Sequence, residues 1–340
     1  MEPTRDCVRP LFWFNIESLK ENNLMTHFFR HATTALAALF ATASAFVFAA
    51  DGDAPQTIRS KPRDTITVVA HRGAGDLAPE NCLSSLELTW KMGGVPEVDV
   101  RTTKDGRIMM FHDANFQRVC PNESEEIRKS SVEKMTYDEV RKLDIGVFRG
   151  EEHRGERVLS IEEIVDALKA DSKRKVVIDV KNVDFQKLSE AVADVREQVI
   201  LTSGSEADLQ RWAKINVEFY DTALWMGLGS YTDADVEKRF EALRKNDFAG
   251  IKRLQIHVTK DSDGALKPSA ACIRACADEC RERGIEFQTM PWRTKTCPEL
   301  ATDIAFHKEL LNLGAMGFGT DRPDCAFQAI DEFYAEEPQK

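Results

Sequence analysis

Residues 65–330 alternate short apolar runs with longer segments in which apolar residues recur every three or four positions. The short runs are rich in β-branched residues and predict strands, whereas the longer segments predict amphipathic helices. Eight strands are predicted, at Ile66–Ala70, Glu97–Arg101, Lys175–Lys181, Val199–Thr202, Glu218–Leu224, Leu254–Val258, Glu286–Met290 and Met316–Thr320. The predicted helices include Cys82–Met92, Ile161–Ala170, Phe185–Glu197, Ala234–Lys245 and Ser269–Arg283.

This alternation fits both a closed (β/α)₈ barrel and a doubly wound open sheet. The positions of the polar residues favour one of these two folds, because polar residues collect where the predicted strands end. His71 and Arg72 follow the first strand, and Thr320 and Asp321 close the last one. A barrel builds its site from the carboxyl ends of its first and last strands alike. We therefore predict an α/β fold, a TIM (β/α)₈ barrel over residues 65–330.

One segment departs from the alternation. Lys104-Asp105-Gly106 is a turn signal between two strand-like arms, so the sequence VRTTKDGRIMMFHD predicts a β-hairpin. Folding at this turn returns His112 to the level of Asp99. The polar residues 114–158 that follow predict a small cap inserted after the second strand and its hairpin.

The ends of the chain differ in character from its middle. An uncharged, Ala-rich run at 32–50 follows Arg30 and ends in small residues that suit cleavage after Ala49. Residues 1–50 therefore predict a signal peptide region, with Met25 as an alternative start and an uncleaved anchor as the alternative reading. Residues 51–64 predict a linker and 331–340 a C-terminal tail. The expected location is secreted or periplasmic, without stable membrane insertion after cleavage.

The net charge limits the class of partner, and the cysteine count limits what can be said of disulfides. Lys and Arg number 46 against 57 Asp and Glu, which gives a net charge of -11. So acidic a balance argues against a nucleic acid as partner, because that binding needs a broad basic face. Seven cysteines follow Ala50, an odd number that would leave at least one unpaired and that dictates no disulfide pattern.

Two carboxylates on the second predicted strand indicate a cation-binding site. Glu97 and Asp99 lie two positions apart, so both face the barrel interior if the intervening valines face the helices. Paired inward carboxylates repel unless a cation offsets their charge, and hard oxygen ligands select Ca²⁺ or Mg²⁺. Asp179, on the next strand, can supply a third ligand to one divalent cation. The alternative for Asp179 is a structural ion pair with Lys181.

Several motifs carry a family resemblance when they are taken in order. VVAHRGAGDLAPEN, EVDVRTTKDG, FHD, IDVK and GFGTDRPD together resemble the glycerophosphodiester phosphodiesterase family over residues 65–330. The resemblance implies a TIM-barrel enzyme with one divalent metal and two histidines, which hydrolyses a small glycerophosphodiester to glycerol phosphate and an alcohol. The family usually has Glu where this chain has Asp179, so the reach of this ligand is shorter here.

Two histidines suit the proton transfers of phosphodiester cleavage near neutral pH, and we expect His71 and His112 to serve as acid and base. Arg72 offers a planar fork and Lys181 a point charge to the phosphate. By resemblance, the substrate's own glycerol hydroxyl attacks and gives a cyclic phosphate that water then opens. The sequence does not show which histidine is the base, although His112 is favoured as the acid.

Other candidates keep alternatives open. Asn81 either caps the first helix or bonds within the active site. Trp292 matches a family aromatic of the glycerol pocket and could equally pack in the core. His257 lies on a predicted inner strand, where it could join the site but is more often a core residue. His307 is expected on the surface.

Two other functions stay open. One is a phospholipase D-like barrel acting on phospholipid or lysophospholipid head groups, which would want exposed aromatics around the site. The other is a non-catalytic barrel that binds phosphate or sugar.

Overall fold

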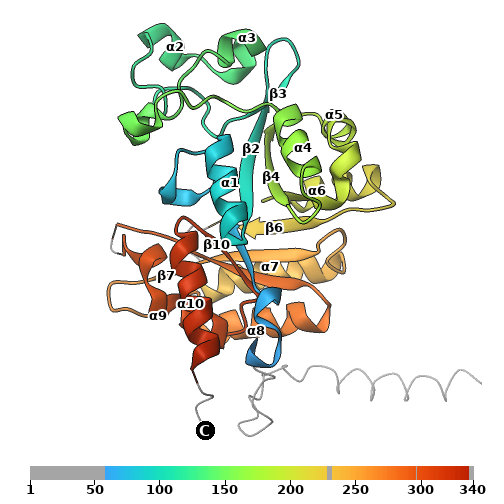
Figure 1. Cartoon of the computed structure of the whole chain (residues 1–340). Helices are drawn as coiled ribbons and strands as arrows, with labels where there is room; N and C mark the ends of the chain where they lie inside the picture. Colours follow the sequence, from blue (N-terminus) through green and yellow to red (C-terminus); the bar gives the residue numbers. More distant parts are fainter. Residues whose placement is uncertain (1–57, 228–231, 296, 337–340) are drawn as a thin grey trace, which may run out of the picture. The chain divides into compact units, whose positions relative to one another are not determined.

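Eight parallel strands close into a ring in the order β1-β10-β9-β7-β6-β5-β4-β2, and β1 also pairs with β2 (Figure 1). The computed structural model describes residues 58–227, 232–295 and 297–336. The predicted TIM barrel is therefore confirmed. The strands are β1 Thr67–Ala70, β2 Val95–Thr102, β3 Ile108–Met110, β4 Val176–Asn182, β5 Val199–Ser203, β6 Thr222–Met226, β7 Arg253–Lys260, β8 Leu266–Lys267, β9 Glu286–Pro291 and β10 Gly317–Thr320.

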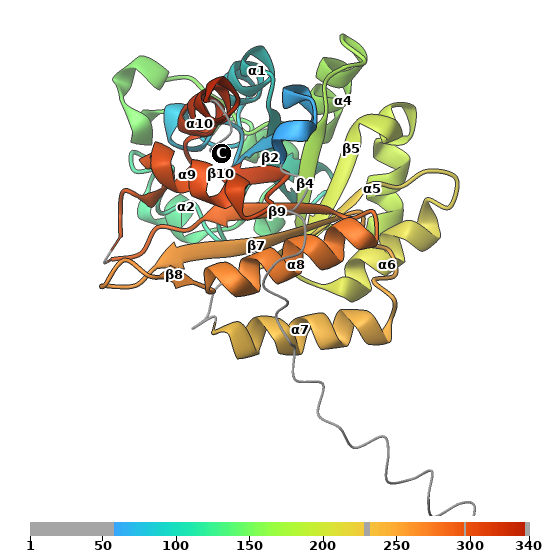
Figure 2. The same ribbon diagram turned by 90° about the horizontal axis from the view of Figure 1, so that it is seen from below.

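Helices cover the outside of the barrel, and α8 runs alongside β7 and β9 (Figure 2). Side chains that cap helix starts mark several boundaries, such as the reciprocal bonds between Ser160 and Glu163 at the start of α4. The α-helices are α1 Leu83–Met92, α2 Glu125–Lys129, α3 Tyr137–Val140, α4 Ile161–Lys169, α5 Phe185–Ala191, α6 Glu206–Ile215, α7 Asp233–Lys245, α8 Ala270–Glu282, α9 Ile304–Asn312 and α10 Pro323–Ala335.

Strand residues alternate between two apolar layers. Val98 and Val100 on β2 are fully buried in the large core that the strands share with the helices. A smaller core includes Val69, Val177 and Ile200, which have the opposite parity on their strands. This period of two directs Glu97 and Asp99 into the barrel, as the sequence predicts.

The hairpin and cap follow β2. β3 pairs antiparallel with β2, and the backbone N–H of Phe111 donates to the carbonyl of Asp99 across 2.8 Å, which returns His112 to the predicted level. Residues 114–158 contain α2, α3 and several 3₁₀ turns, which lie apart from the helices around the barrel in Figure 1. Phe116, Val119 and Val140 are fully buried in a separate small core. The polar insertion therefore has an apolar interior of its own.

Some predicted boundaries are wrong. β6 begins at Thr222 instead of Glu218, because Val217 and Phe219 are exposed and their alternation imitates a strand. The predicted tail 331–340 is partly helix, since α10 continues to Ala335 and buries Phe333. Residues 58–64 of the predicted linker also pack on the barrel, with Arg59 over the ring of Phe333.

The predicted signal peptide region 1–50 and linker residues 51–57 lie outside the described residues. Within the described ranges, none of the helices combines the length and apolar character that a bilayer span requires. Each of the seven cysteines that the structure describes carries a free thiol.

Candidate active site

A cavity opens at the carboxyl ends of the barrel strands, and we call it the mouth cavity. Charged and polar side chains from the ends of several strands line it, together with apolar side chains of the barrel interior. The carboxyl ends of the strands are where TIM barrels build their sites. Among the residues that line it are His71, Arg72, Glu97, His112, Asp179, Lys181, Trp225, His257 and Trp292.

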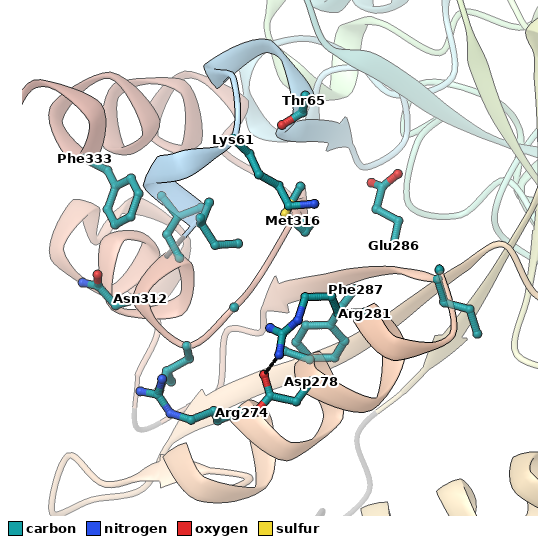
Figure 3. A pocket seen from close by; sticks show the side chains of 17 residues that line it. Lys61, Thr65, Arg274, Asp278, Arg281, Glu286, Phe287, Asn312, Met316 and Phe333 are labelled. Carbon is teal, nitrogen blue, oxygen red and sulfur yellow. Dashed lines mark ion pairs between the residues drawn. The ribbon is translucent and has the colours of Figure 1, made fainter. Parts of the chain in front are cut away.

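Another cavity lies where β9 and β10 begin, near the C-terminal ends of α8 and α9 (Figure 3). Figure 3 shows the ion pair between Arg281 and Asp278 in its wall. None of the described residues that line this cavity is a histidine. The amino ends of barrel strands ordinarily serve stability, so the mouth cavity is the candidate active site.

The chain turns sharply after β1 to place the first site residues. The backbone N–H of His71 donates to the carbonyl of Thr320, and that of Arg72 donates to the Glu97 carboxylate across 2.7 Å. Arg72 has a φ of 52°, a left-handed conformation that is rare for a residue with a side chain. Gly75 cannot be replaced by a residue with a side chain without a clash, because a Cβ there would lie 2.2 Å from the carbonyl oxygen of Asp321. Gly75 of the HRGAG motif thus allows the loops after the first and last barrel strands to touch.

Glu97, Asp99 and Asp179 form the acidic centre of the site. Each offers a carboxylate oxygen, and these oxygens lie within 4.8 Å of one another. Asp99 on β2 and Asp179 on β4 are directly paired in the sheet, so two strands that are far apart in sequence bring these side chains together. The structure therefore contains an acidic cluster that could hold a metal ion, formed by the three predicted ligands.

The pKa values of these carboxyls show that their negative charges repel one another. Burial and the neighbouring charge of Asp99 raise the pKa of Glu97 to about 8. Burial also raises the pKa of Asp179. Burial opposes ionisation of Asp99 as well, but Lys181 and the nearby histidines hold the pKa of this carboxyl below its usual value. A cation is the ordinary partner that allows such a group to ionise fully.

Asn81 and Lys181 fix the position of Asp99. The Asn81 side-chain amide donates to Oδ2 of Asp99 and accepts from its backbone N–H, both at 3.0 Å. Asn81 is 1% exposed, and Cys82 occupies the position that caps α1. Of the two alternatives for Asn81, the structure therefore shows the bond within the site and not the helix cap, since both ends of its amide contact Asp99. A direct contact of Asn81 with substrate stays a prediction. Lys181 Nζ lies 2.7 Å from Asp179 and 3.1 Å from Asp99, so the alternative ion pair exists but also includes Asp99.

His71 is paired with Asp321. Nδ1 of His71 lies 2.8 Å from Oδ1 of Asp321. Burial alone would lower the pKa of His71, but the bond to Asp321 and the charge of Glu97 raise it above its ordinary value. For Asp321, burial alone would raise the pKa, but the contacts with His71 and Arg293 lower it to about 2. The carboxylate thus assigns the ring proton to Nδ1 and leaves Nε2 for substrate.

His112 has a similar arrangement with a different partner at its other nitrogen. Nδ1 of His112 lies 2.7 Å from Oδ1 of Asp113, and Nε2 lies 3.0 Å from Nη2 of Arg72. A guanidinium can only donate, so Nε2 of His112 accepts and Nδ1 carries the proton. Arg118 from the cap holds Asp113 in place at 2.8 Å, and these bonds keep the pKa of Asp113 well below its usual range despite burial.

Aromatic rings stack on one side of the mouth cavity. The His257 ring lies 4.5 Å from that of Trp292 and 6.2 Å from that of Trp225, with interplanar angles of 14° and 15°. Trp292 is 37% exposed, so it belongs to the cavity wall and not to the core. His257 is largely buried but lines the cavity, whereas His307 is fully buried and its predicted surface position is wrong.

The structure thus brings together His71, Arg72, His112, Lys181, Trp292 and the three carboxylates. Asn81 contacts Asp99 but is not among the residues that line the mouth cavity. Sequence reasoning gave no role to Asp321, Asp113 or Trp225. Asp321 and Asp113 stand in the GFGTDRPD and FHD motifs, so their signal was present. Trp225 offered none, because its strand was predicted to end at Leu224.

Comparison with known proteins agrees with this geometry. The model of the glycerophosphoryl diester phosphodiesterase family matches residues 71–325. A glycerophosphodiester phosphodiesterase of Caldanaerobacter subterraneus is 30% identical over 153 residues, which cover 42% of this chain and 60% of that protein. The chain therefore spans less than two thirds of the length of that relative.

Solved structures share the fold. A glycerophosphodiester phosphodiesterase of Agrobacterium tumefaciens superposes with a TM-score of 0.56 at 22% identity, over 77% of this chain and 98% of that one. An Oleispira antarctica phosphodiesterase, solved in complex with the product sn-glycerol-3-phosphate, gives 0.57 at 21% identity, over 81% of this chain and 100% of that one. The extent of the family match shows that the chain belongs to the glycerophosphoryl diester phosphodiesterase family.

Proposed function

We propose that this protein is a metal-dependent phosphodiesterase that hydrolyses glycerophosphodiesters to glycerol phosphate and an alcohol. One observation carries the proposal: both histidines and Arg72 line the same cavity as the carboxylates Glu97 and Asp179. Acid–base groups, a phosphate-binding cation and an acidic cluster are the parts that cleavage of a phosphodiester needs.

The cofactor in this proposal is one divalent cation, Ca²⁺ or Mg²⁺, held by Glu97, Asp99 and Asp179. The donor set fits such an ion, because it consists of two buried carboxyls and the partly buried Asp179, and Glu97 and Asp179 have raised pKa values without a cation. When bound, the ion would polarise the phosphoryl oxygens and offset negative charge that develops on them. Asn81 and Lys181 would keep Asp99 in position for it.

Arg72 is placed to bind a phosphate oxygen. Its Nη1 lies 3.3 Å from Glu80 and its Nη2 contacts His112, whereas its Nε is buried without a hydrogen-bond partner among the described residues. A buried donor without a partner is costly, so it indicates an acceptor supplied by a ligand. Lys181 lines the same cavity and supplies a second positive charge.

The two histidines differ in how their rings are held, and this difference suggests their roles. Because Nη2 of Arg72 donates to Nε2 of His112, this nitrogen keeps its lone pair and is unprotonated. When a phosphate binds the guanidinium in place of His112, Nε2 is free to act as a general base. His71, with Asp321 behind it, suits the general acid that protonates the leaving oxygen. This assignment is the reverse of the one that the sequence favoured.

The phospholipase D-like alternative gains little support. Four large hydrophobic side chains are exposed among the described residues, namely Leu83, Val217, Phe219 and Trp292, and Trp292 is the one of these that lines the mouth cavity. Interfacial action on lipid would want a larger apolar rim. The proposed substrate is therefore a small glycerophosphodiester.

We also propose export, to a secreted or periplasmic location, on the Ala-rich run at 32–50. N-terminal sequencing of the protein recovered from its native host should give a start near residue 50. A chain that still carries residues 32–50 would argue against cleavage.

The activity is tested by phosphorus NMR of a panel of glycerophosphodiesters and lysophospholipids, with and without EDTA. We expect glycerol phosphate from the water-soluble diesters and none after chelation. Exclusive cleavage of lysophospholipids would favour the phospholipase alternative, and the absence of any cleavage would contradict the proposal.

A further inference from the structure

Two cavities meet at His71 and Arg72. Both residues line the mouth cavity and also a second cavity beside it, whereas His112 is found in the lining of the mouth cavity. We call the second one the charged pocket. It is lined by six further charged side chains from the loops after β1, β9 and β10 and from the cap, namely Asp76, Glu80, Arg118, Arg149, Arg293 and Asp321.

We propose that the charged pocket binds the leaving alcohol of the substrate, and that this alcohol is rich in hydroxyl groups, such as glycerol or a cyclitol. The inference rests on the proposed function. A phosphodiester held by Arg72 has two ester arms, and the two cavities on either side of this residue give each arm a place.

Ion pairs hold the pocket walls in a fixed arrangement. Arg118 from the cap grips both oxygens of Glu80, at 2.6 and 2.7 Å. Arg293 bridges Asp76 at 2.6 Å and Asp321 at 2.7 Å. Because each charge fixes its neighbour, little ordering remains to be done when a ligand enters.

Arg149 is the least committed of these groups. It reaches from the cap to Oδ1 of Asp76 through Nη2, at 3.2 Å, which leaves most of its guanidinium donors for a ligand. Its side chain is 33% exposed. The cap therefore contributes a donor that can contact the leaving group without touching the catalytic histidines.

The composition of the pocket indicates the class of alcohol. Apart from Arg72, which the phosphate would engage, three carboxylates face three guanidiniums, so this part of the pocket has little preference for a charged head group. A hydroxyl can donate to a carboxylate and accept from a guanidinium at once. A quaternary ammonium such as choline offers no hydrogen bond and prefers aromatic faces, and none of the described residues that line the pocket is Phe, Tyr or Trp.

The position of His71 agrees with this division. His71 lines both cavities, so it can reach the oxygen that joins the phosphate to an alcohol in the charged pocket. The stacked rings of His257 and Trp292 line the mouth cavity, where the glycerol of glycerol phosphate would lie.

The test compares kcat/KM for glycerophosphoglycerol and glycerophosphoinositol with that for glycerophosphocholine. We expect the native protein to prefer the hydroxyl-rich esters by about 10-fold or more, because a site built for hydroxyl groups rejects analogues that lack them. Arg149→Ala and Arg149→Gln should lower this preference by about 10-fold, through loss of charged hydrogen bonds. Arg154→Ala is the matched control, since Arg154 is a cap arginine paired with Glu151 outside the pocket.

Equal rates on all three esters, or a preference for the choline ester, would overturn the inference. So would a preference that both Arg149 variants leave unchanged. Hydrolysis of none of the esters would contradict the proposed function and this inference with it, whereas hydrolysis with an unchanged preference would contradict the inference alone.

Discussion

Nδ1 of His71 donates a hydrogen bond to Oδ1 of Asp321 across 2.8 Å, although 250 residues separate the two in sequence. His71 follows the first barrel strand and Asp321 follows the last, so closure of the barrel creates this pair. The bond orients the imidazole and leaves Nε2 for the substrate. Asp321 in turn is held by Arg293 at 2.7 Å.

Replacement of Asp321 by Asn should lower kcat by about 10²-fold or more, because an amide no longer fixes the tautomer of His71 or stabilises its charged form. The effect on KM should be smaller and should come from the charged pocket that Asp321 also lines. Steady-state kinetics on glycerophosphoglycerol measure both constants. Asp331→Asn is the control, since Asp331 is an exposed carboxylate of α10 that pairs with Arg63. An Asp321→Asn variant with native kcat would show that the pair only supports the fold.

Loss of each histidine should be distinguishable by the leaving group. His71→Ala should reduce hydrolysis of an ordinary alcohol ester by about 10² to 10⁴ and that of a nitrophenyl ester much less, because a good leaving group needs no acid. His112→Ala should reduce both alike. Equal losses on both esters in both variants, with metal still bound, would contradict these roles, and near-native activity would remove that histidine from the mechanism.

Asn81→Ala should weaken binding of the divalent cation by about 10- to 100-fold, because Asn81 fixes both the side chain and the backbone of Asp99. Calorimetric titration with Ca²⁺ and Mg²⁺ measures the affinity. Asn182→Ala, at an exposed position near the end of β4, serves as control. An unchanged affinity would mean that Asp99 keeps its position without Asn81.

His257 should make the folded state less stable in acid. Burial, with the nearby charge of His71, lowers the pKa of His257 to about 4 from 6.5. Between these values the unfolded chain takes up a proton that the folded chain does not, so stability falls as the pH falls. This site alone should cost up to about 3 kcal/mol between about pH 7 and pH 4.

His257→Phe keeps a ring in the stack with Trp225 and Trp292 and cannot take up that proton. Urea unfolding at several pH values should therefore show a shallower loss of stability in the variant than in the native protein. Parallel profiles would mean that His257 ionises equally in both states. The fully buried His307 also has a lowered pKa, so some acid sensitivity should remain in the variant.

The fold and the centre of the site follow from local patterns. A period of two on β2 predicts that Glu97 and Asp99 face inward, and the turn at Asp105-Gly106 predicts the return of His112. Both inferences need only the geometry of a strand and a tight turn. The grouping of polar residues at strand ends then predicts where the site lies.

Other features depend on contacts that no local pattern records. The capping motif could not show that Asn81 faces Asp99, because that contact is made between the first loop and the second strand. The stack around His257 joins three different strands or loops, and the exposed Val217 and Phe219 imitate the alternation of a strand. Barrel closure, which the sequence predicts, places Asp321 near His71, but the motif that contains Asp321 does not show which side chain it bonds.

In the proposed mechanism, Glu97, Asp99 and Asp179 hold one divalent cation that hydrolysis of glycerophosphodiesters requires. The most direct test measures hydrolysis of glycerophosphoglycerol by the chelated protein as Ca²⁺ or Mg²⁺ is added back. We expect no activity after chelation, recovery that saturates at one ion per chain, retention of this behaviour in Asp179→Glu, and loss of metal binding in Asp179→Ala. Full activity after exhaustive chelation, or native metal dependence in Asp179→Ala, would contradict the account.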